Sequence, residues 1–226
     1  MERFRLWDLP TRLFHWLLVL CVCGSFVSAK IGGNAMVWHG RFGLVVVGLL
    51  AFRLVWGFVG STYARFTHFV RGPATILAYL RGQWHGAGHN PLGALSVLAM
   101  LGTLLLLVAT GLFANDDIAF EGPLYALIGK ELSDRLVGIH RLVEPLIILL
   151  VVTHIAAIIY YVRFRKERLV MPMIRGWKAG PGEPATGGGA VAFVVALTVA
   201  LAAVYGASGA WIKAPPPPPA STTPAF

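Results

Sequence analysis

Residues 142–162 read LVEPLIILLVVTHIAAIIYYV, an apolar run in which Glu144 is the only charged residue. Comparable runs cover residues 13–29, 42–60, 92–114 and 190–205. Each approaches the roughly 20 residues that cross about 30 Å of hydrocarbon as a helix. Because lipid offers no hydrogen bonds to the backbone and strand-like alternation is absent, the runs are expected to be helices. The sequence predicts an all-α membrane protein: a four-helix transmembrane bundle plus a fifth, C-terminal transmembrane helix.

The positive charge of the chain follows this topology. The formal net charge is +9, yet only 13% of the residues are charged. Basic residues gather before the first run and in the loops after the second and fourth runs, whereas the loop after the third run is rich in acids. By the positive-inside rule, this alternation places the N-terminus in the cytoplasm. It also accounts for the basicity without a nucleic-acid partner.

The first run has a second interpretation. Its basic start, apolar stretch and small-residue end at residues 27–29 resemble a secretory signal with a cleavage site. Against cleavage, the preceding segment contains Asp8 and Pro10, and aromatic residues flank the run where interfacial anchors belong. We expect the helix to be retained. Cleavage would remove His15.

The chain divides into a membrane domain and an appendage. We predict a transmembrane domain at residues 1–178, a Gly/Pro linker at 179–189, an extra transmembrane helix at 190–212 and a proline-rich disordered tail at 213–226. Small residues in the last helix indicate an anchor or a close helix contact. Between the second and third runs, the sequence that follows Gly72 and Pro73 predicts a short amphipathic helix on the inner surface.

Four histidines fall inside the predicted spans, at two matched depths. The alternating helix directions put His39 and His140 (the outer pair) near the outer face and His15 and His154 (the inner pair) near the inner face. An ionisable side chain at membrane depth is costly and is a functional candidate by default. A haem iron takes one axial ligand from each side of its macrocycle. Two levels with two histidines each therefore predict two bis-histidine haem sites.

The spacing within the fourth span agrees with this prediction. His154 follows His140 by fourteen residues, about 21 Å along a helix and only about 40° apart around it. Two planar cofactors can then stack along one bundle axis. Tetrahedral zinc is disfavoured because each level supplies two ligands. For any one histidine alone, a hydrogen bond to a neighbouring helix is the alternative.

Three arginines are candidates to bind haem propionates. Arg53 follows His39 by fourteen residues and is expected toward the inner level, whereas Arg41 and Arg141 flank the outer ligands. A guanidinium neutralises a carboxylate and donates a forked hydrogen bond; snorkelling to the headgroups is the alternative. Glu144 is expected to pair with an outer arginine or to take part in proton transfer with a quinone. Glycines beside the ligands are expected to let a macrocycle approach: Gly40, Gly43 and Gly138.

The order of motifs resembles bacterial cytochrome b561-type proteins, including the b-type cytochrome subunits of nickel–iron hydrogenases, over residues 3–178. The motifs are RLWDLPTRLFHW (5–16), WHGRFG (38–43), GHNPLG (88–93) and GIHR (138–141), followed by His154. The resemblance implies two haems b, with iron ligated by His15, His39, His140 and His154. His89 matches a recurrent family position that is not a ligand, and it is expected to cap the third span or to lie near the inner haem.

We therefore expect a di-haem b-type cytochrome of the bacterial inner (plasma) membrane, embedded in lipid. It would carry electrons between the quinone pool and a redox partner, either a c-type cytochrome or a hydrogenase or other dehydrogenase subunit. This describes an electron-transfer subunit of a respiratory oxidoreductase rather than a stand-alone enzyme, and no catalytic residue is predicted. The alternative is a non-redox transporter or anchor subunit whose histidines carry protons or metal.

Overall fold

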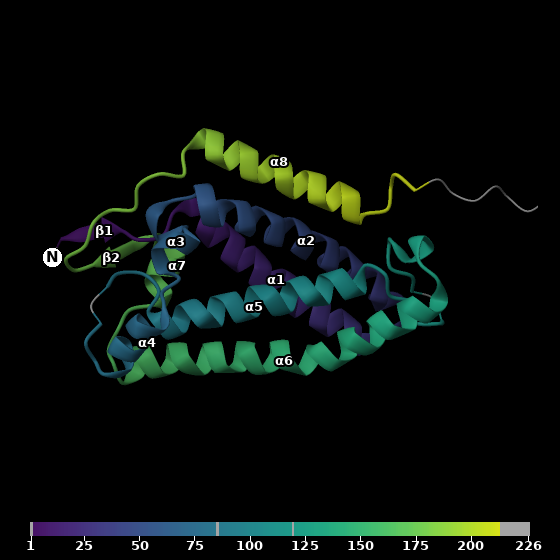
Figure 1. Cartoon of the computed structure of the whole chain (residues 1–226), viewed down its shortest axis with the longest axis horizontal. Coiled ribbons are helices and arrows are strands. Elements are labelled where there is room, and N and C mark those ends of the chain that lie inside the picture. Colours follow the sequence, from purple (N-terminus) through teal and green to yellow (C-terminus); the bar gives the residue numbers. More distant parts are fainter. Residues whose placement is uncertain (1, 85, 119, 213–226) are drawn as a thin grey trace, which may run out of the picture.

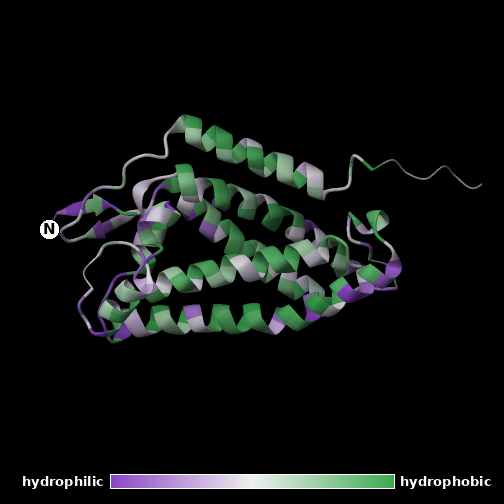
Figure 2. Cartoon of the chain, viewed as in Figure 1, coloured by the Kyte–Doolittle hydropathy of each residue, from purple (hydrophilic) through white to green (hydrophobic). Residues whose placement is uncertain are grey.

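The chain is built from long apolar helices. The computed structural model describes residues 2–84, 86–118 and 120–212 (Figure 1). Within these residues, five helices are long and apolar enough to cross a membrane: α1 (Leu9–Ile31), α2 (Met36–Val59), α5 (Pro91–Gly111), α6 (Lys130–Arg163) and α8 (Ala190–Ala207). Their surfaces are hydrophobic along most of their length (Figure 2). The prediction of an all-α, multi-pass membrane protein is confirmed.

The shorter elements lie at the two ends of these helices. The 3₁₀ turns are η1 (Gly33–Ala35), η2 (Thr62–Ala64) and η3 (Tyr125–Leu127), and the short helices are α3 (Phe66–Phe69), α4 (Pro73–Leu80) and α7 (Val170–Arg175). Two strands, β1 (Arg3–Arg5) and β2 (Trp177–Ala179), pair antiparallel with Phe4 opposite Lys178. Helix α4 is the short helix predicted after Gly72. The strands were not predicted.

Local sequence signals set the helix ends. The Asp8 side chain caps α1 by accepting a hydrogen bond of 2.6 Å from the Thr11 amide. Asn90 caps α5 in the same way, with 2.7 Å to the Gly93 amide. Both helices carry proline in their first turn, where its missing N–H costs nothing. Helix α1 ends at Ile31, and its C-terminal cap is Gly32, whose φ of 70° suits glycine.

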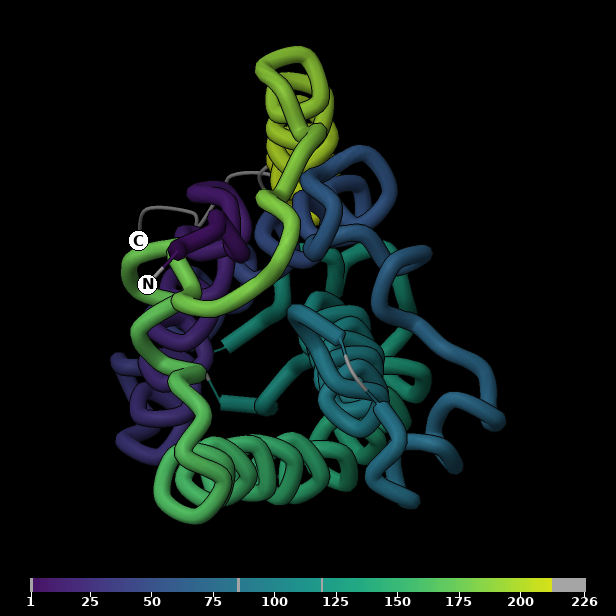
Figure 3. The backbone as a smooth tube through the Cα atoms, turned by 90° about the vertical axis from the view of Figure 1, so that its left-hand side faces the viewer, coloured from purple at the N-terminus to yellow at the C-terminus, as the bar shows by residue number. Residues whose placement is uncertain are grey.

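Helices α1, α2, α5 and α6 surround a common axis, and α8 lies outside them against α2 (Figure 3). The central side chains come from all four bundle helices, with Phe14, Leu50, Trp56, Leu101 and Ile147 buried together. The last helix ends at Ala207, before the predicted boundary at residue 212. The predicted tail at 213–226 lies outside the described residues.

Small residues bring α8 close to α2, as predicted. Ala196 is fully buried and Ala200 is 7% exposed. A Cβ atom placed on Gly48 of α2 would lie only 2.7 Å from Val204 Cγ2. Without a hydrophobic force between helices in lipid, such close van der Waals contact is what holds two spans together.

Replacing Gly48 by leucine is expected to loosen α8. Overpacking a close contact typically costs about 1–3 kcal/mol, so the thermal midpoint of the purified protein should fall. Cysteine pairs placed across the α2–α8 contact should also crosslink more slowly. Gly102→Leu is the matched control, because a Cβ there meets no described atom within 4 Å. Equal midpoints for the two variants would contradict the packing argument.

The N-terminal segment is tied to the residues that follow α6. Leu6 N donates to Gly176 O at 2.8 Å, and Arg12 Nη1 donates to Ile174 O at 2.6 Å. Residues of the predicted linker join the same end, since Ala185 N donates to Arg5 O at 2.7 Å. Residues 5–12 of the first motif therefore have a structural role: they fasten the start of α1 to residues 174–176, which follow α6 in the sequence.

Asp8 joins several elements at this end of the molecule, and Asp8→Ala is expected to lower the stability of the fold. Its carboxylate is 8% exposed and also accepts hydrogen bonds from Trp56 Nε1, at 3.1 Å, and from the Ser61 hydroxyl. Removing the cap and two buried acceptor contacts should lower the free energy of unfolding by about 3 kcal/mol. Asp134→Ala, which removes an exposed helix ion pair, should cost under about 0.5 kcal/mol. Denaturant titration in detergent measures both.

Candidate functional site

The structure brings the two rings of the outer pair together. The His39 ring on α2 and the His140 ring on α6 have centroids 6.2 Å apart, with their planes at 74°. An imidazole nitrogen binds a transition metal at about 2 Å, so two imidazoles on opposite sides of one metal have centroids roughly 6 Å apart. The observed separation matches a single metal held between the two rings.

Both outer rings are oriented by hydrogen bonds from Nδ1. His39 Nδ1 lies 2.9 Å from Ser25 O on α1, and His140 Nδ1 lies 3.0 Å from Leu107 O on α5. A carbonyl oxygen only accepts, so each Nδ1 carries the proton and each Nε2 keeps a free lone pair. This backbone support is typical of metal-ligating histidines. The Thr110 hydroxyl lies 3.1 Å from His140 Nδ1.

Small residues surround the outer pair. A Cβ on Gly111 would approach His140 Cε1 to 3.2 Å, so glycine lets the ring lie against α5. A Cβ on Gly43 or on Gly138 would meet no described atom within 4 Å, whereas one on Gly40 would meet the Phe120 ring at 3.0 Å. The backbone beside the outer ligands is therefore open at Gly43 and Gly138 and covered at Gly40.

The charges around the outer pair differ from the expected arrangement. Glu144 forms an ion pair of 2.7 Å with Lys30 of α1, not with Arg41 or Arg141. Arg41 is exposed and lies over the Trp38 ring, 4.8 Å from its centroid. Arg141 is also exposed. Lys30 reaches Glu144 because it ends α1 at the same level, which sequence spacing within one helix does not reveal.

The inner pair lies at the opposite end of the bundle. His15 on α1 and His154 on α6 are both half-buried and close enough to interact electrostatically. The His15 ring contacts the Trp16 ring edge-on, with 4.9 Å between centroids. His15 Nδ1 is buried and has no hydrogen-bond partner among the described residues. The inner histidines therefore lie at one level, without the carbonyl support found at the outer level.

Buried polar atoms without a partner gather near the inner pair. Across the described residues, the buried side-chain nitrogens and oxygens that lack a hydrogen bond all come from the inner half of the bundle. They belong to Thr11, His15, Arg53, Arg65 and His89. Leaving such a group unpaired costs roughly 1–3 kcal/mol, so this end of the protein is suited to a bound group that carries hydrogen-bond acceptors.

Arg53 is the member of that set best suited to bind an anionic group. It is 4% exposed, and its guanidinium lies over the Phe66 and Phe69 rings at 4.7 and 5.8 Å. Of the two expectations for Arg53, snorkelling to the headgroups does not fit a guanidinium this buried. The Asp8 carboxylate is close enough to act on Arg53 electrostatically, but Arg53 Nη1 has no hydrogen-bond partner among the described residues. A carboxylate of a bound cofactor is a fitting acceptor for that nitrogen.

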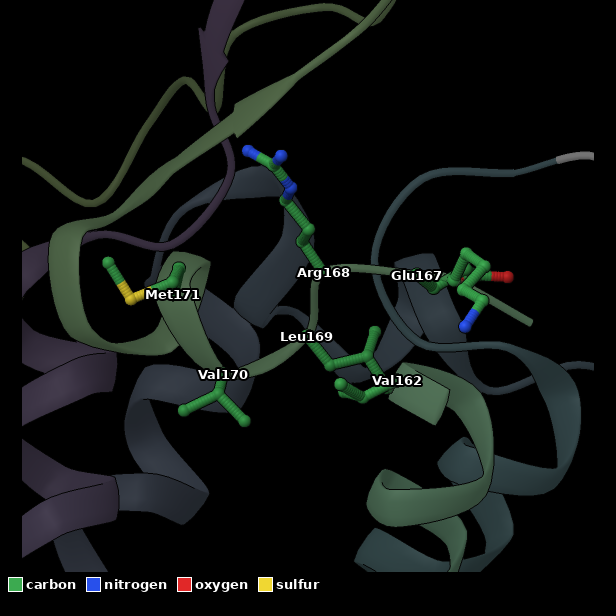
Figure 4. Close-up of a pocket in the computed structure, with 7 residues that line it drawn as sticks. Val162, Glu167, Arg168, Leu169, Val170 and Met171 are labelled. Atoms are coloured by element: carbon green, nitrogen blue, oxygen red, sulfur yellow. The ribbon is translucent and has the colours of Figure 1, made fainter. Parts of the chain in front are cut away.

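Other parts of the described structure do not form a comparable site. No group of three His, Cys, Asp or Glu side chains comes together within those residues. A surface hollow of about 280 Å³ lies where α6 turns into α7, and none of the four span histidines lines it (Figure 4). Val162 and Leu169 lie next to each other there, while Arg168 and Glu167 point away.

Apolar spans that hold two facing imidazoles with free Nε2 lone pairs define a membrane protein able to ligate a metal cofactor from both sides. The family model described as prokaryotic cytochrome b561 matches residues 6–176, and the chain belongs to this family. It is therefore a membrane b-type cytochrome of electron transfer, and its cofactor is haem b.

Two curated relatives match part of the chain. Both are named probable Ni/Fe-hydrogenase 1 B-type cytochrome subunit, one from Escherichia coli strain K12 and one from Escherichia coli O157:H7. Each is 25% identical over 135 residues, covering 46% of this chain and 57% of the relative. The chain thus spans little more than half the length of these relatives. No solved structure matches.

Proposed function

We propose that this cytochrome binds two haems b, one between His39 and His140 and one between His15 and His154. The outer pair carries the proposal: the rings are 6.2 Å apart, and both Nδ1 atoms lie within hydrogen-bonding distance of backbone carbonyls. Iron in such a site supplies reversible one-electron transfer. A haem held by two imidazoles would have no free position for oxygen, so the function is electron transfer rather than oxygen binding.

The protein's own residues orient the ligands and set their basicity. The carbonyls of Ser25 and Leu107 hold the outer imidazoles in one tautomer and increase electron donation from Nε2. The inner histidines lack this support, and the buried Arg53 places a positive charge at their end of the bundle. Electron-rich outer ligands and a positive inner environment should give the inner haem the higher midpoint potential.

The two sites provide a path across the membrane. His140 and His154 are fourteen residues apart on α6, which corresponds to about 21 Å of helix. The ends of α1 and α6 near the inner pair are rich in arginine, so the N-terminus faces the cytoplasm of a bacterium and the bundle sits in its inner membrane. Residues 1–178 form the haem domain, with α8 as an added anchor after the linker.

The electron donor and acceptor are the quinone pool and a redox protein. The name of the Escherichia coli relatives supports a hydrogenase or other dehydrogenase as that protein, and a c-type cytochrome is the other class that takes single electrons from such a carrier. Arg53 binds propionates of the inner haem in this proposal, and Arg41 and Arg141 bind those of the outer haem. Glu144 is paired with Lys30 and lies on α6, the helix that carries His140 and His154. In this proposal Glu144 carries protons for quinone chemistry.

An absorption spectrum of the purified protein tests the proposal. Reduction should give the sharp bands of low-spin haem b, and a pyridine assay should find about two haems per chain. One haem per chain would overturn the two-site arrangement. A colourless protein purified from haem-replete cells would favour the non-redox alternative. Addition of a quinol analogue to the oxidised protein, followed at the same bands, tests the link to the quinone pool.

A further inference from the structure

His89 is a buried histidine without a role in the four proposed iron ligands. It precedes the Asn90 cap of α5, so it does not itself cap that helix. Its ring lies between Trp7, at 4.9 Å, and Phe69, at 4.8 Å. Its Nδ1 atom is buried and has no hydrogen-bond partner within the described part of the chain.

The surroundings of His89 are those of the inner site. Burial lowers the pKa of the His89 imidazole to about 3, and the nearby Arg53, His154 and His15 act in the same direction. The ring is therefore neutral at physiological pH and sits within electrostatic range of both inner histidines. A neutral imidazole donates one N–H. His89 Nδ1 and Arg53 Nη1, both at this end of the bundle, have no hydrogen-bond partner among the described residues.

The combination of donors suits a carboxylate. Arg53 supplies a positive charge and an unpaired Nη1, and it stacks on the same Phe69 ring that His89 contacts. A buried cation with a neutral N–H donor beside it matches a carboxylate, which accepts several hydrogen bonds at once. Haem b has two carboxylate side chains, the propionates, on one edge.

We propose that His89 and Arg53 form a propionate clamp for the inner haem, with His89 donating from Nδ1 to a propionate oxygen. The inference rests on the proposed function, which supplies that haem, and extends it to a residue outside the bundle helices. Because His89 belongs to the connection between α4 and α5 and packs on Trp7, haem binding would also fasten this connection and the N-terminal segment to the bundle.

His89→Phe and His89→Gln test the clamp. Phenylalanine keeps an aromatic ring between Trp7 and Phe69 but removes the donor, whereas glutamine keeps an N–H donor. In His89→Phe we expect the inner haem to bind about tenfold more weakly, as for a lost charge-assisted hydrogen bond of about 1.4 kcal/mol. Its midpoint potential should fall, because a less compensated propionate favours the oxidised iron. His89→Gln should lie near the wild type.

The measurements are a spectroelectrochemical titration of both haems and haem retention on dilution in detergent. The inner haem is identified as the one absent from His154→Ala, and the outer haem is an internal control. His68→Phe is the matched variant: this histidine lies at the same end, stacked edge-on against Tyr63, and is not among the unpaired groups.

Three results would overturn the clamp: an unchanged inner haem in His89→Phe, an equal shift in the outer haem, or His89→Gln behaving like His89→Phe. In each of these the wild type still carries two haems, so the proposed function survives. A wild-type protein without the second haem would instead contradict the proposed function itself. Infrared difference spectra with isotope-labelled propionates add a direct readout, since the carboxylate band should shift in His89→Phe alone.

Discussion

His140→Ala is expected to purify with one haem per chain in place of two. His140 is the outer ligand on α6, and its partner His39 cannot hold the macrocycle from one side as firmly as two imidazoles do. Alanine is the best helix former, so α6 itself should persist. The remaining haem should keep the spectrum and midpoint potential of the inner site. Pyridine assay and redox titration of the purified variant measure the loss.

Matched variants separate ligand loss from general damage. His68→Ala removes a histidine at the opposite end of the molecule and should retain both haems. Imidazole added during expression should restore part of the outer haem to His140→Ala, because the small ligand can occupy the space of the lost ring. Two low-spin haems in untreated His140→Ala would refute the pairing of His39 with His140.

The spans were predictable because their causes are local in the sequence, although α6 begins at Lys130, well before its apolar run. Hydropathy over twenty residues decides which segments enter lipid, and the caps at Asp8 and Asn90 act within three residues of their own position. The depth of each histidine follows from its position in a span and the direction of that span. These features need no knowledge of which helices touch.

The support around the ligands was not predictable because it depends on how the helices are rotated against each other. The carbonyls of Ser25 and Leu107 carry no side-chain signal, so the sequence cannot show that they accept from His39 and His140. The Lys30–Glu144 ion pair joins α1 to α6 in the same way. Polar residues in a span, such as Ser25 and Thr110, are the one local hint that a hydrogen bond is needed there.

Pro145 is a local signal for the shape of α6. It lies inside α6, between the two histidines, where it removes a backbone hydrogen bond and bends a helix. Figure 1 shows α6 changing direction along its length. The estimate of about 40° between His140 and His154 assumes a straight helix, so the bend alters their relative orientation while leaving the two levels well separated.

The sequence of the N-terminal segment does not indicate which residues it contacts. In the structure, Trp7 packs on His89, and Asp8 binds Trp56 and the Ser61 hydroxyl. Strand β1 pairs with β2, more than 170 residues further along the chain. Such long-range pairing leaves no periodic signal in three residues. Its effect is to fasten the residues around the inner pair, which supports the inner site from outside the helices.

His154→Ala is expected to remove the inner haem and to stop electron transfer across the membrane. The outer haem should remain, because its ligands lie about 21 Å away along α6. Electrons that reach the outer haem would then have no cofactor within tunnelling distance of the inner face. In vesicles with ferricyanide inside and dithionite outside, the transfer rate should fall to that of protein-free vesicles.

The same vesicles distinguish a lost relay from a misfolded protein. In His154→Ala, dithionite should still reduce the outer haem in the molecules that present it to the outside, so the bands of that haem report correct folding. His68→Ala vesicles should transfer electrons at the wild-type rate. A wild-type rate in His154→Ala would mean that electrons cross without the inner site. In that case the outer haem alone would be enough to pass electrons across the bilayer. The inner pair of histidines would then need a role other than electron transfer.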